Sequence, residues 1–342
     1  MKNFKKVITV IGGGPFATAL AYILTQNNNK VIWYMRNEEI VKSLIRKGVN
    51  HKYLPWVRFN KAAISPTNNL QEAVDCSEFI VIAVPSAYLY DAVLSAVPGI
   101  VWKEKKIISA VKGLVTNGNK LLNDYLRGMY DFPIENYVSL MGPCHAEEIA
   151  KGLKSYPTFS GLDEKLTKSV STLFAGKSIE ARCNNDVWGA QFAAILKNVY
   201  AIGAGIATKL DGYGDNFTSV YVTNCRKEMV TFLGKHFNLV HPAPDMPDFS
   251  NSVYLGDLLV TAYSSFSRNR TFGGHVGKGL SPKAASDEMA DGFPEGYYAA
   301  KAMMEISKEH KLKIPIAKAV YEILWNGASS EQIFEKLCKT FN

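Results

Sequence analysis

Residues 7–26 read VITVIGGGPFATALAYILTQ, which is a β-branched run, three glycines and an apolar helix-like segment in succession. Gly12, Gly14 and Ala17 fit the pattern G-x-G-x-x-G/A, in which the first glycine makes a tight turn and the second lets the backbone approach a pyrophosphate. Pro15 suits the first position of a helix, where its missing N–H costs nothing. The start of such a helix offers free amides to phosphate. The stretch therefore predicts a strand, a phosphate-binding turn and a helix, and a tight turn without ligand is the alternative.

The same stretch, with Lys2, Lys5 and Lys6 before it, imitates a secretory signal peptide. Three glycines and a proline interrupt it where a signal peptide needs a continuous apolar helix. No other segment reaches 18 uninterrupted apolar residues, so we expect no membrane span and a cytoplasmic protein. The five cysteines are scattered without a C-x-x-C pair, which fits a reducing compartment and argues against a disulfide framework or a metal site.

The 342 residues are enough for about two domains. The first half alternates short β-branched runs with amphipathic segments, which indicates a parallel sheet with helical crossovers. We expect strands at 7–11, 31–35, 79–84, 106–111, 137–141, 158–160 and 178–181. We expect helices between them at 16–26, 38–46, 87–97 and 119–129.

Long helical patterns dominate after about residue 185, and we expect helices at 188–210, 216–236, 253–266, 294–310, 316–325 and 331–340. The predicted fold class is α/β, with an N-terminal Rossmann-like doubly wound sheet over residues 1–186 and an all-α C-terminal domain over residues 187–342. Ligands of such folds bind at the carboxyl ends of the strands, so we expect the site between the domains. The proline-rich His241–Ser250 segment is a loop of unusual composition.

Lysine and arginine outnumber aspartate and glutamate by 39 to 31, which gives a formal net charge of +8. Such a surplus favours anionic partners. Because the basic residues form no run or stripe, the sequence favours a small anionic substrate over nucleic acid.

The end of the second strand normally selects between the two nicotinamide dinucleotides, because an acidic residue there binds the ribose hydroxyls of NAD and a basic one accommodates the 2′-phosphate of NADP. Here Met35 is followed by Arg36 and Asn37, and Glu38 is read as a first-turn helix residue. The residue types favour NADPH. The alternative is that Arg36 is a solvated surface charge.

Lys197 and Asn198 lie on an otherwise apolar helical segment. Burial lowers the pKa of a lysine and makes it useful as a proton shuttle near neutral pH. The alternative is a lysine whose amine reaches the surface.

Two further groups carry polar residues that an apolar core would not need. Asp257 can orient a neighbouring ammonium group, and Arg268 offers a forked donor for phosphate, with Ser267 and Asn269 as neutral donors. Read alone, the segment from Ser267 to Arg270 could also be a helix C-terminus, where cationic side chains commonly interact with the last carbonyl groups. Lys112 follows a buried strand and is a candidate for binding an anion.

Cys144 and His145 follow the next strand. No spacing in the sequence suggests a nucleophile with a base, so we read these two residues as structural.

The short motifs of this sequence follow one another along the chain in a definite order. The glycine loop at 12–20 comes first, and the segments 111–113, 142–143, 196–199, 256–258, 267–270 and 295–296 follow it. In this order the chain resembles bacterial NAD(P)-dependent glycerol-3-phosphate dehydrogenase over almost its whole length. The resemblance implies interconversion of sn-glycerol 3-phosphate and dihydroxyacetone phosphate by hydride transfer with NAD(P)H. It makes Lys197 the proton acceptor and donor, with Asp257 as its catalytic partner, and implies supply of glycerol 3-phosphate for phospholipid synthesis.

The resemblance also implies binding residues. The substrate positions are Lys112, Gly142, Cys144, Lys197, Asp257, Ser267, Arg268 and Asn269. The dinucleotide positions are Gly12, Gly14, Pro15, Phe16, Arg36, Tyr53, Lys112, Ala146, Arg268, Phe293 and Glu295.

The chain departs from the family pattern at four positions. Pro15 replaces a serine and Ala17 a glycine, while Cys144 and His145 stand where Ser or Thr and then Phe are more usual.

Two alternatives stay open, another two-domain NAD(P)-dependent hydroxyacid dehydrogenase and a non-catalytic NAD(P)-sensing module. The Ser267–Asn269 segment argues against the first. The combination of a proton-transferring lysine, Lys197, with a phosphate-binding arginine, Arg268, argues against the sensing module, because a sensor does not need to transfer a proton. The sequence leaves open whether the chain forms a homodimer.

Overall fold

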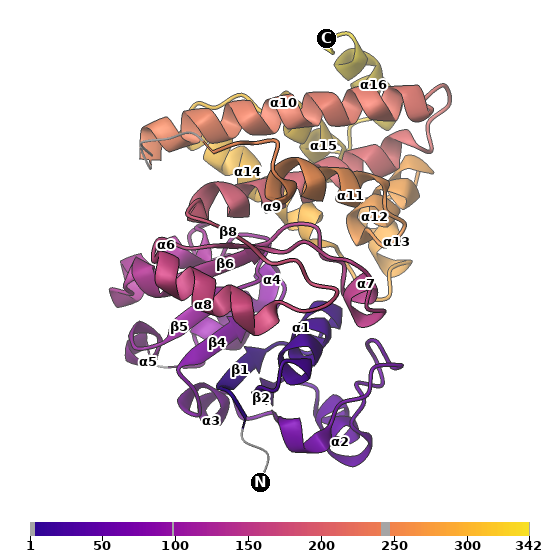
Figure 1. The fold of residues 1–342 in the computed structure, drawn as a ribbon. Coiled ribbons are helices and arrows are strands. Elements are labelled where there is room, and N and C mark those ends of the chain that lie inside the picture. The colour runs from indigo at the N-terminus through magenta and orange to yellow at the C-terminus, as the bar shows by residue number, and fades with distance from the viewer. Residues whose placement is uncertain (1–3, 98, 241–246, 342) are drawn as a thin grey trace. The chain divides into compact units, whose positions relative to one another are not determined.

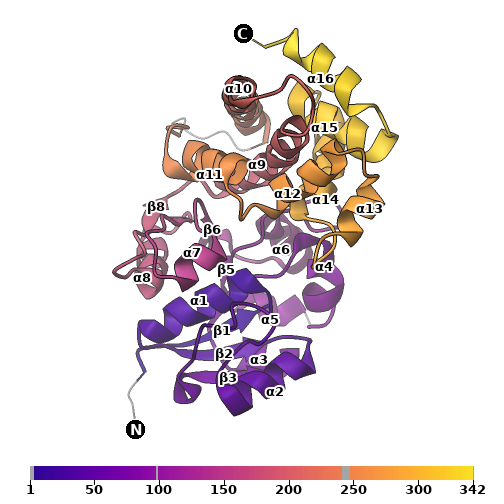
Figure 2. The ribbon, with the colours of Figure 1, turned by 90° about the vertical axis from the view of Figure 1, so that its right-hand side faces the viewer.

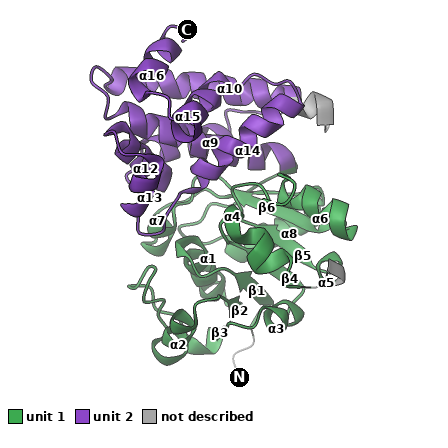
Figure 3. Ribbon diagram, turned by 180° about the vertical axis from the view of Figure 1, so that it is seen from behind, with its two compact units in different colours: residues 1–187 green, residues 188–342 purple. Residues whose placement is uncertain are grey.

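The computed structural model describes residues 4–97, 99–240 and 247–341. The chain forms two compact units, Met1–Val187 and Trp188–Asn342 (Figure 3). Each unit is described by itself below.

The first unit is built on an eight-stranded sheet in the order β3-β2-β1-β4-β5-β6-β7-β8 (Figure 1). Neighbouring strands are parallel, except that β6 and β7 run antiparallel. From β1 the chain builds outward to β2 and β3, then returns to the other side of β1 with β4. This reversal of strand order is the switch point at which doubly wound folds bind ligands. The strands are β1 Val7–Ile11, β2 Lys30–Tyr34, β3 Ile64–Thr67, β4 Phe79–Ile82, β5 Lys106–Ser109, β6 Tyr137–Met141, β7 Thr158–Ser160 and β8 Arg182–Asn184.

Helices connect these strands, and α1 packs beside α7 and α8 (Figure 2). Their bounds are α1 Pro15–Gln26, α2 Glu38–Lys47, η1 Lys61–Ala63, α3 Leu70–Asp75, α4 Ser86–Leu89, the π-helical η2 Tyr90–Leu94, α5 Gly99–Lys103, α6 Leu122–Tyr130, η3 Ile134–Asn136, α7 Ala146–Ala150 and α8 Glu164–Phe174.

The predicted fold class is confirmed, and six of the expected strands form. The strand expected at 178–181 is wrong, because Ile179 makes only isolated bridges and the pairing with β7 falls on Arg182–Asn184. The sequence reading missed β3, an edge strand that contains Pro66 and tolerates it because an edge needs fewer donors. It also missed α8, whose serines, threonines and valine are weak helix formers.

The second unit is helical, and every strand of the described chain lies in the first. Its elements are α9 Val187–Ala207, α10 Asp215–Val240, the π-helical η4 Ser252–Gly256, α11 Asp257–Tyr263, α12 Arg268–Gly277, α13 Pro282–Asp287, α14 Glu295–Glu309, α15 Pro315–Asn326 and α16 Ser330–Cys338. Residues 241–246 of the proline-rich segment lie outside the described residues. Among the described helices, α9 alone is long and apolar enough to cross a membrane, and its apolar window is entirely buried inside the structure.

A buried carboxylate joins three of these helices. Glu228 on α10 accepts hydrogen bonds from the backbone N–H groups of Ile316, at 2.6 Å, and Ala317, at 3.0 Å, in the first turn of α15. The hydroxyl of Tyr200 on α9 donates to the same carboxylate at 3.0 Å. Burial raises the pKa of Glu228 to about 7 against the opposing effect of these three donors. Glu228 therefore supplies the cap that α15, which begins with Pro315, lacks in its own sequence.

Two glycines let α9 and α12 touch backbone to backbone. A Cβ added to Gly273 would lie 2.0 Å from the carbonyl oxygen of Ile202, and one added to Gly205 would lie 2.0 Å from that of Arg270. No side chain fits between the helices at these positions. The close approach therefore depends on glycine at both.

We expect Gly273→Ala to destabilise the protein by about 1–3 kcal/mol or more, because the added methyl group overlaps the α9 backbone. Gly274→Ala is the matched control on the same helix, since its Cβ would find its nearest heavy atom at 3.7 Å. Replacing this helical glycine should stabilise by about 0.5–1 kcal/mol. Urea unfolding of the two variants measures both values. Equal stability for Gly273→Ala and the parent protein would contradict the close contact.

Candidate active site

The glycine loop of the first unit is shaped by its contact with the end of β4. Gly12 has φ +135°, and a Cβ there would lie 2.3 Å from the carbonyl oxygen of Ala83. A Cβ added to Gly14 would have no heavy atom of the described residues within 4 Å. Gly14 caps α1 without a side-chain hydrogen bond, and Pro15 is the first helical residue. The loop thus leaves open space before a helix N-terminus, which fits a pyrophosphate.

Two side chains that the sequence reading missed hold this loop. The indole Nε1 of Trp33 donates to the carbonyl oxygen of Gly12 at 2.7 Å. Asn50 is fully buried, and its Nδ2 donates to the carbonyl oxygen of Gly13 at 3.1 Å and to Oγ1 of Thr18 at 2.9 Å. Because these contacts span 21 to 37 residues of sequence, no local pattern could have revealed them.

Asn50 also connects the loop to Tyr53. Its Oδ1 accepts a hydrogen bond from the backbone N–H of Tyr53 at 3.1 Å. The Tyr53 ring is partly buried and packs against the apolar core of the first unit. Asn50 thus places this predicted dinucleotide-contact residue at a fixed position relative to the glycine loop.

The structure brings together two other predicted residues, Phe16 and Lys112. The ammonium of Lys112 lies 5.0 Å from the centroid of the Phe16 ring, a cation–π contact. These residues follow β1 and β5, so the strand ends of the sheet do converge here.

Arg36 follows β2 and is exposed. Its guanidinium carbon lies 5.6 Å from the ring centroid of Tyr88, which follows β4 and was not among the predicted residues. Glu38 begins α2 and pairs with Lys42 at 3.1 Å, as expected of a first-turn helix residue. The cation at the end of β2 is therefore held against an aromatic ring, with no carboxylate directly after it in the sequence.

Gly142, Cys144 and Ala146 follow β6. Gly142 has φ +95°, and the thiol of Cys144 donates to its carbonyl oxygen at 3.1 Å. Both Cys144 and Ala146, the first residue of α7, are buried. The thiol turns back to its own backbone, which fits a structural role for this side chain.

In the second unit, Lys197 on α9 forms an ion pair with Oδ1 of Asp257, the first residue of α11. Only 4% of Lys197 and 1% of Asp257 is exposed, so the alternative in which Lys197 reaches the surface is wrong. Oδ2 of Asp257 has no hydrogen-bond partner among the described residues. A buried pair of charges pays a large desolvation penalty, so it is weak evidence for a stabilising role and points to chemistry.

Ser267 and Arg268 begin a helix. Ser267 caps α12 with its Oγ accepting from the backbone N–H of Arg270 at 3.3 Å, and Arg268 is the first helical residue. The reading of this segment as a cationic helix C-terminus is therefore wrong. A guanidinium opposes the dipole at a helix N-terminus, so its charge does not serve the helix. It donates to the carbonyl oxygen of Gly292 at 3.1 Å, and both the arginine and the helix start would attract an anion.

The remaining predicted residues lie around the start of α14. The Phe293 ring stacks on Tyr297 with centroids 4.1 Å apart, and Tyr297 stacks on Trp325 at 4.4 Å. Glu295 is the first residue of α14. Asn269 is buried and bonded to Asn198, its neighbour across the contact between α12 and α9.

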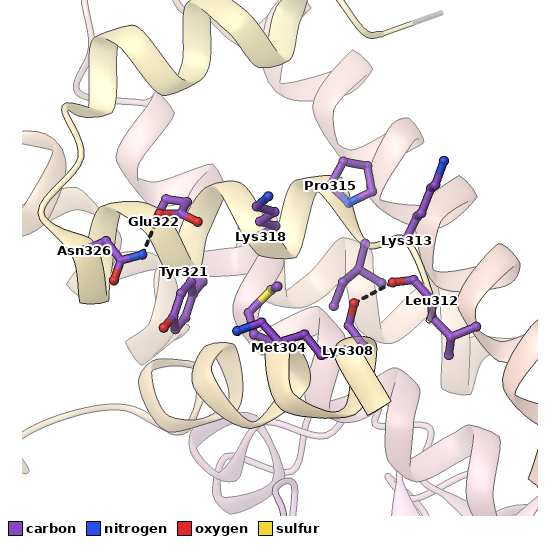
Figure 4. A pocket seen from close by; sticks show the side chains of 11 residues that line it. Met304, Lys308, Leu312, Lys313, Pro315, Lys318, Tyr321, Glu322 and Asn326 are labelled. Carbon is purple, nitrogen blue, oxygen red and sulfur yellow. Dashed lines mark hydrogen bonds between the residues drawn. The ribbon is translucent and has the colours of Figure 1, made fainter. Parts of the chain in front are cut away.

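A separate cavity of about 540 Å³ lies in the second unit between α14 and α15 (Figure 4). Met304, Leu312 and Ile314 form apolar parts of its wall, and three lysines lie around it. None of the predicted site residues lines this cavity. Within residues 4–97, 99–240 and 247–341, no cluster of three histidine, cysteine, aspartate or glutamate side chains could hold a metal ion.

A doubly wound sheet with an open glycine loop, followed by a helical unit with a buried lysine–aspartate pair, is the architecture of the two-domain dinucleotide-dependent dehydrogenases. Comparison with known proteins narrows this class. The model of the NAD-dependent glycerol-3-phosphate dehydrogenase N-terminus matches residues 7–166, and that of the C-terminus matches residues 186–335. The chain belongs to this family, as the resemblance in its sequence predicted.

Individual relatives of the chain support the same family assignment. The glycerol-3-phosphate dehydrogenase [NAD(P)+] of Halothermothrix orenii is 32% identical over 93% of this chain and 90% of its own length. That of a Thermotoga species is 32% identical over 96% of both chains. The crystal structure of glycerol-3-phosphate dehydrogenase from Coxiella burnetii covers 98% of this chain and 99% of its own, with a TM-score of 0.84 at 24% identity, which supports the fold.

We expect Asn50→Asp to lower the free energy of unfolding by about 1–3 kcal/mol, because a carboxylate cannot donate to the buried oxygens of Gly13 and Thr18. Asn69→Asp is the matched control, since Asn69 caps α3 as an acceptor only and aspartate caps equally well. Denaturant unfolding of both variants checks the difference. Equal losses in the two would show that the Asn50 bonds do not hold the loop.

Proposed function

We propose that this protein interconverts sn-glycerol 3-phosphate and dihydroxyacetone phosphate with NAD(P)H. The observation that carries the proposal is the buried ion pair of Lys197 and Asp257, in a chain that belongs to the glycerol-3-phosphate dehydrogenase family. The first unit would be the dinucleotide-binding domain and the second the substrate-binding and catalytic domain.

The residues of the first unit fit a dinucleotide. The space before Gly14 and the uncapped start of α1 would receive the pyrophosphate. Further contacts with the dinucleotide would come from these residues of the first unit: Gly12, Pro15, Phe16, Tyr53, Lys112 and Ala146. In the second unit they would come from Arg268, Phe293 and Glu295. The dinucleotide supplies the hydride chemistry when bound.

Arg36 supports a preference for NADPH. Its guanidinium, held against Tyr88, offers a charged, forked donor for a 2′-phosphate. The first carboxylate after it, Glu38, is engaged with Lys42.

Lys197 would move the proton. In oxidation, the neutral amine form of Lys197 takes the proton of the C2 hydroxyl on its Nζ as the carbonyl forms, and so becomes the ammonium. In the reverse direction, the ammonium gives that proton to the C2 oxygen of dihydroxyacetone phosphate. Asp257 holds the ammonium through Oδ1, and its Oδ2 remains an acceptor for a substrate hydroxyl.

Arg268 would hold the phosphate of the substrate. It stands at the start of α12, where the helix dipole also favours a negative charge, and Ser267 and Asn269 flank it with neutral donors. Lys112, Gly142 and Cys144 complete the proposed substrate contacts.

The proposal extends to the cellular role. We propose a cytoplasmic enzyme that supplies glycerol 3-phosphate for phospholipid synthesis, and a homodimer as its assembly. The five free cysteines support a reducing compartment.

The direct test adds dihydroxyacetone phosphate to the purified protein and follows the loss of NADPH and, separately, NADH absorbance. We expect rapid oxidation, faster with NADPH because of Arg36. Absence of activity with both dinucleotides, in a protein shown to be folded, would reject the proposal. Activity with a 2-oxo or 3-oxo acid, and none with dihydroxyacetone phosphate, would indicate a hydroxyacid dehydrogenase instead.

We expect Lys197→Ala to reduce kcat by at least about a hundredfold while NADPH binding, measured by fluorescence, persists. The exposed Lys227 on α10 gives the control Lys227→Ala, which should retain full activity.

Because Lys197→Ala leaves Asp257 buried without its cation, the double variant Lys197→Met/Asp257→Asn repeats the measurement with both charges removed. Near-normal turnover in either form would exclude Lys197 from the proton transfer.

A further inference from the structure

We propose that Asn269 is a positioning residue that sets the direction of the Asn198 amide, so that both buried amides offer only N–H donors to the substrate. The inference deepens the proposed function and rests on it for the identity of the substrate. It is carried by two hydrogen bonds that join α9, α12 and α14.

The chain of bonds starts from a group that can only donate. Gly296 is the second residue of α14, and its backbone N–H needs an acceptor because Pro294 caps this helix without a side-chain bond. Oδ1 of Asn269 accepts from that N–H at 2.8 Å. Since a backbone N–H cannot accept, the atom of Asn269 that faces Gly296 must be its oxygen.

The direction of the second amide follows from the first. With its oxygen on Gly296, Asn269 turns its Nδ2 to Oδ1 of Asn198 at 3.0 Å. Asn198 therefore uses its oxygen within the protein, and the hydrogens of its Nδ2 take no part in this chain of bonds. The usual ambiguity between the two ends of an asparagine amide is removed at both residues.

Packing keeps the two amides in this arrangement. Only 4% of Asn198 and 8% of Asn269 is exposed. A Cβ on Gly296 would lie 2.7 Å from Oδ1 of Asn269 and 2.5 Å from the backbone oxygen of Asn198. The start of α14 is therefore packed directly against Asn198 and Asn269.

The arrangement suits a ligand rich in oxygen acceptors. In the sequence, Asn198 directly follows Lys197 and Asn269 directly follows Arg268, and both of these cations belong to the proposed site. The hydrogens left over on the two amides can only donate, as phosphate and carbonyl oxygens require. A substrate that had to donate at these positions would be rejected.

Asn269→Asp separates this positioning role from a structural one. The carboxylate still accepts from Gly296, and a negative charge at the start of α14 is favourable, so the melting temperature should stay within a few degrees of the parent value. The amide of Asn198 must then turn, because only its Nδ2 can bond to a second acceptor. Its oxygen would face the substrate, and kcat/KM for dihydroxyacetone phosphate should fall by on the order of 10–100-fold, the effect of one hydrogen bond to a charged group.

The turn of the amide can be observed without substrate or dinucleotide. In the ¹H–¹⁵N spectrum of asparagine-labelled protein, the Asn198 side-chain signals, assigned with Asn198→Ala, should shift downfield in Asn269→Asp as Nδ2 gains a charged acceptor. Asn216→Asp adds the same charge to an exposed position at the start of α10 and should change neither the signals nor kcat/KM. Asn269→Ala, which leaves Gly296 without its acceptor, should lower both the melting temperature and kcat/KM.

Parent-like kcat/KM and unshifted Asn198 signals in Asn269→Asp would overturn the proposal and leave Asn269 a structural cap. A melting temperature as low as that of Asn269→Ala would overturn the bond to Gly296. If the spectra show the turn but the parent protein does not reduce dihydroxyacetone phosphate, the amide chain stands and the proposed function fails.

Discussion

The charge pair of Lys197 and Asp257 is the constraint around which the helical unit is organised. Removing two charges from water costs several kcal/mol per ion, so each must be held where the other compensates it. The residues on either side of the pair Lys197–Asn198 in α9 are apolar and buried, which prevents the lysine from reaching water instead. Asp257 stands at the start of α11, immediately after the π-helical turn of Ser252–Gly256. The pair needs both α9 and α11 to be fixed. The glycine contacts with α12 and the bond from Tyr200 to Glu228 help to fix α9, while α11 packs against α10 and α12.

Two buried carboxylates of the helical unit, Glu228 and Asp257, differ in how far their hydrogen-bonding capacity is used within the protein. Glu228 accepts three hydrogen bonds that lie at a helix junction, so its bonding capacity is largely used within the protein. Asp257 bonds Lys197 through one oxygen and has no hydrogen-bond partner among the described residues for the other. Both carboxylates are buried, but only Asp257 has spare bonding capacity beside a movable proton. The amide of Asn269 is also largely used within the protein, because its oxygen accepts from α14 and one Nδ2 hydrogen bonds to Asn198.

The glycine loop depends on support from outside its own motif. Gly12 can make its turn because it lacks a side chain, but Trp33 and Asn50 hold its carbonyl groups in place. Such support reduces the conformational freedom that a run of three glycines would otherwise keep. At position 15, proline suits the first turn of α1, because its ring fixes a helical φ and its missing N–H costs nothing there.

The sequence by itself determined the α/β class, the glycine loop, the lysine on an apolar helix and the family, because these depend on local periodicity and on the order of short motifs. It misplaced the last strand and missed β3, since edge strands carry little hydrophobic signal. It left Lys197 between core and surface, and Ser267–Arg270 between a helix start and a helix end, because burial and capping depend on which segments pack together. Asn50, Trp33, Glu228 and the bond from Asn198 to Asn269 emerged only from the tertiary structure. Their partners lie 21 to 89 residues away, and only folding brings a lone polar side chain to the one atom that can satisfy it.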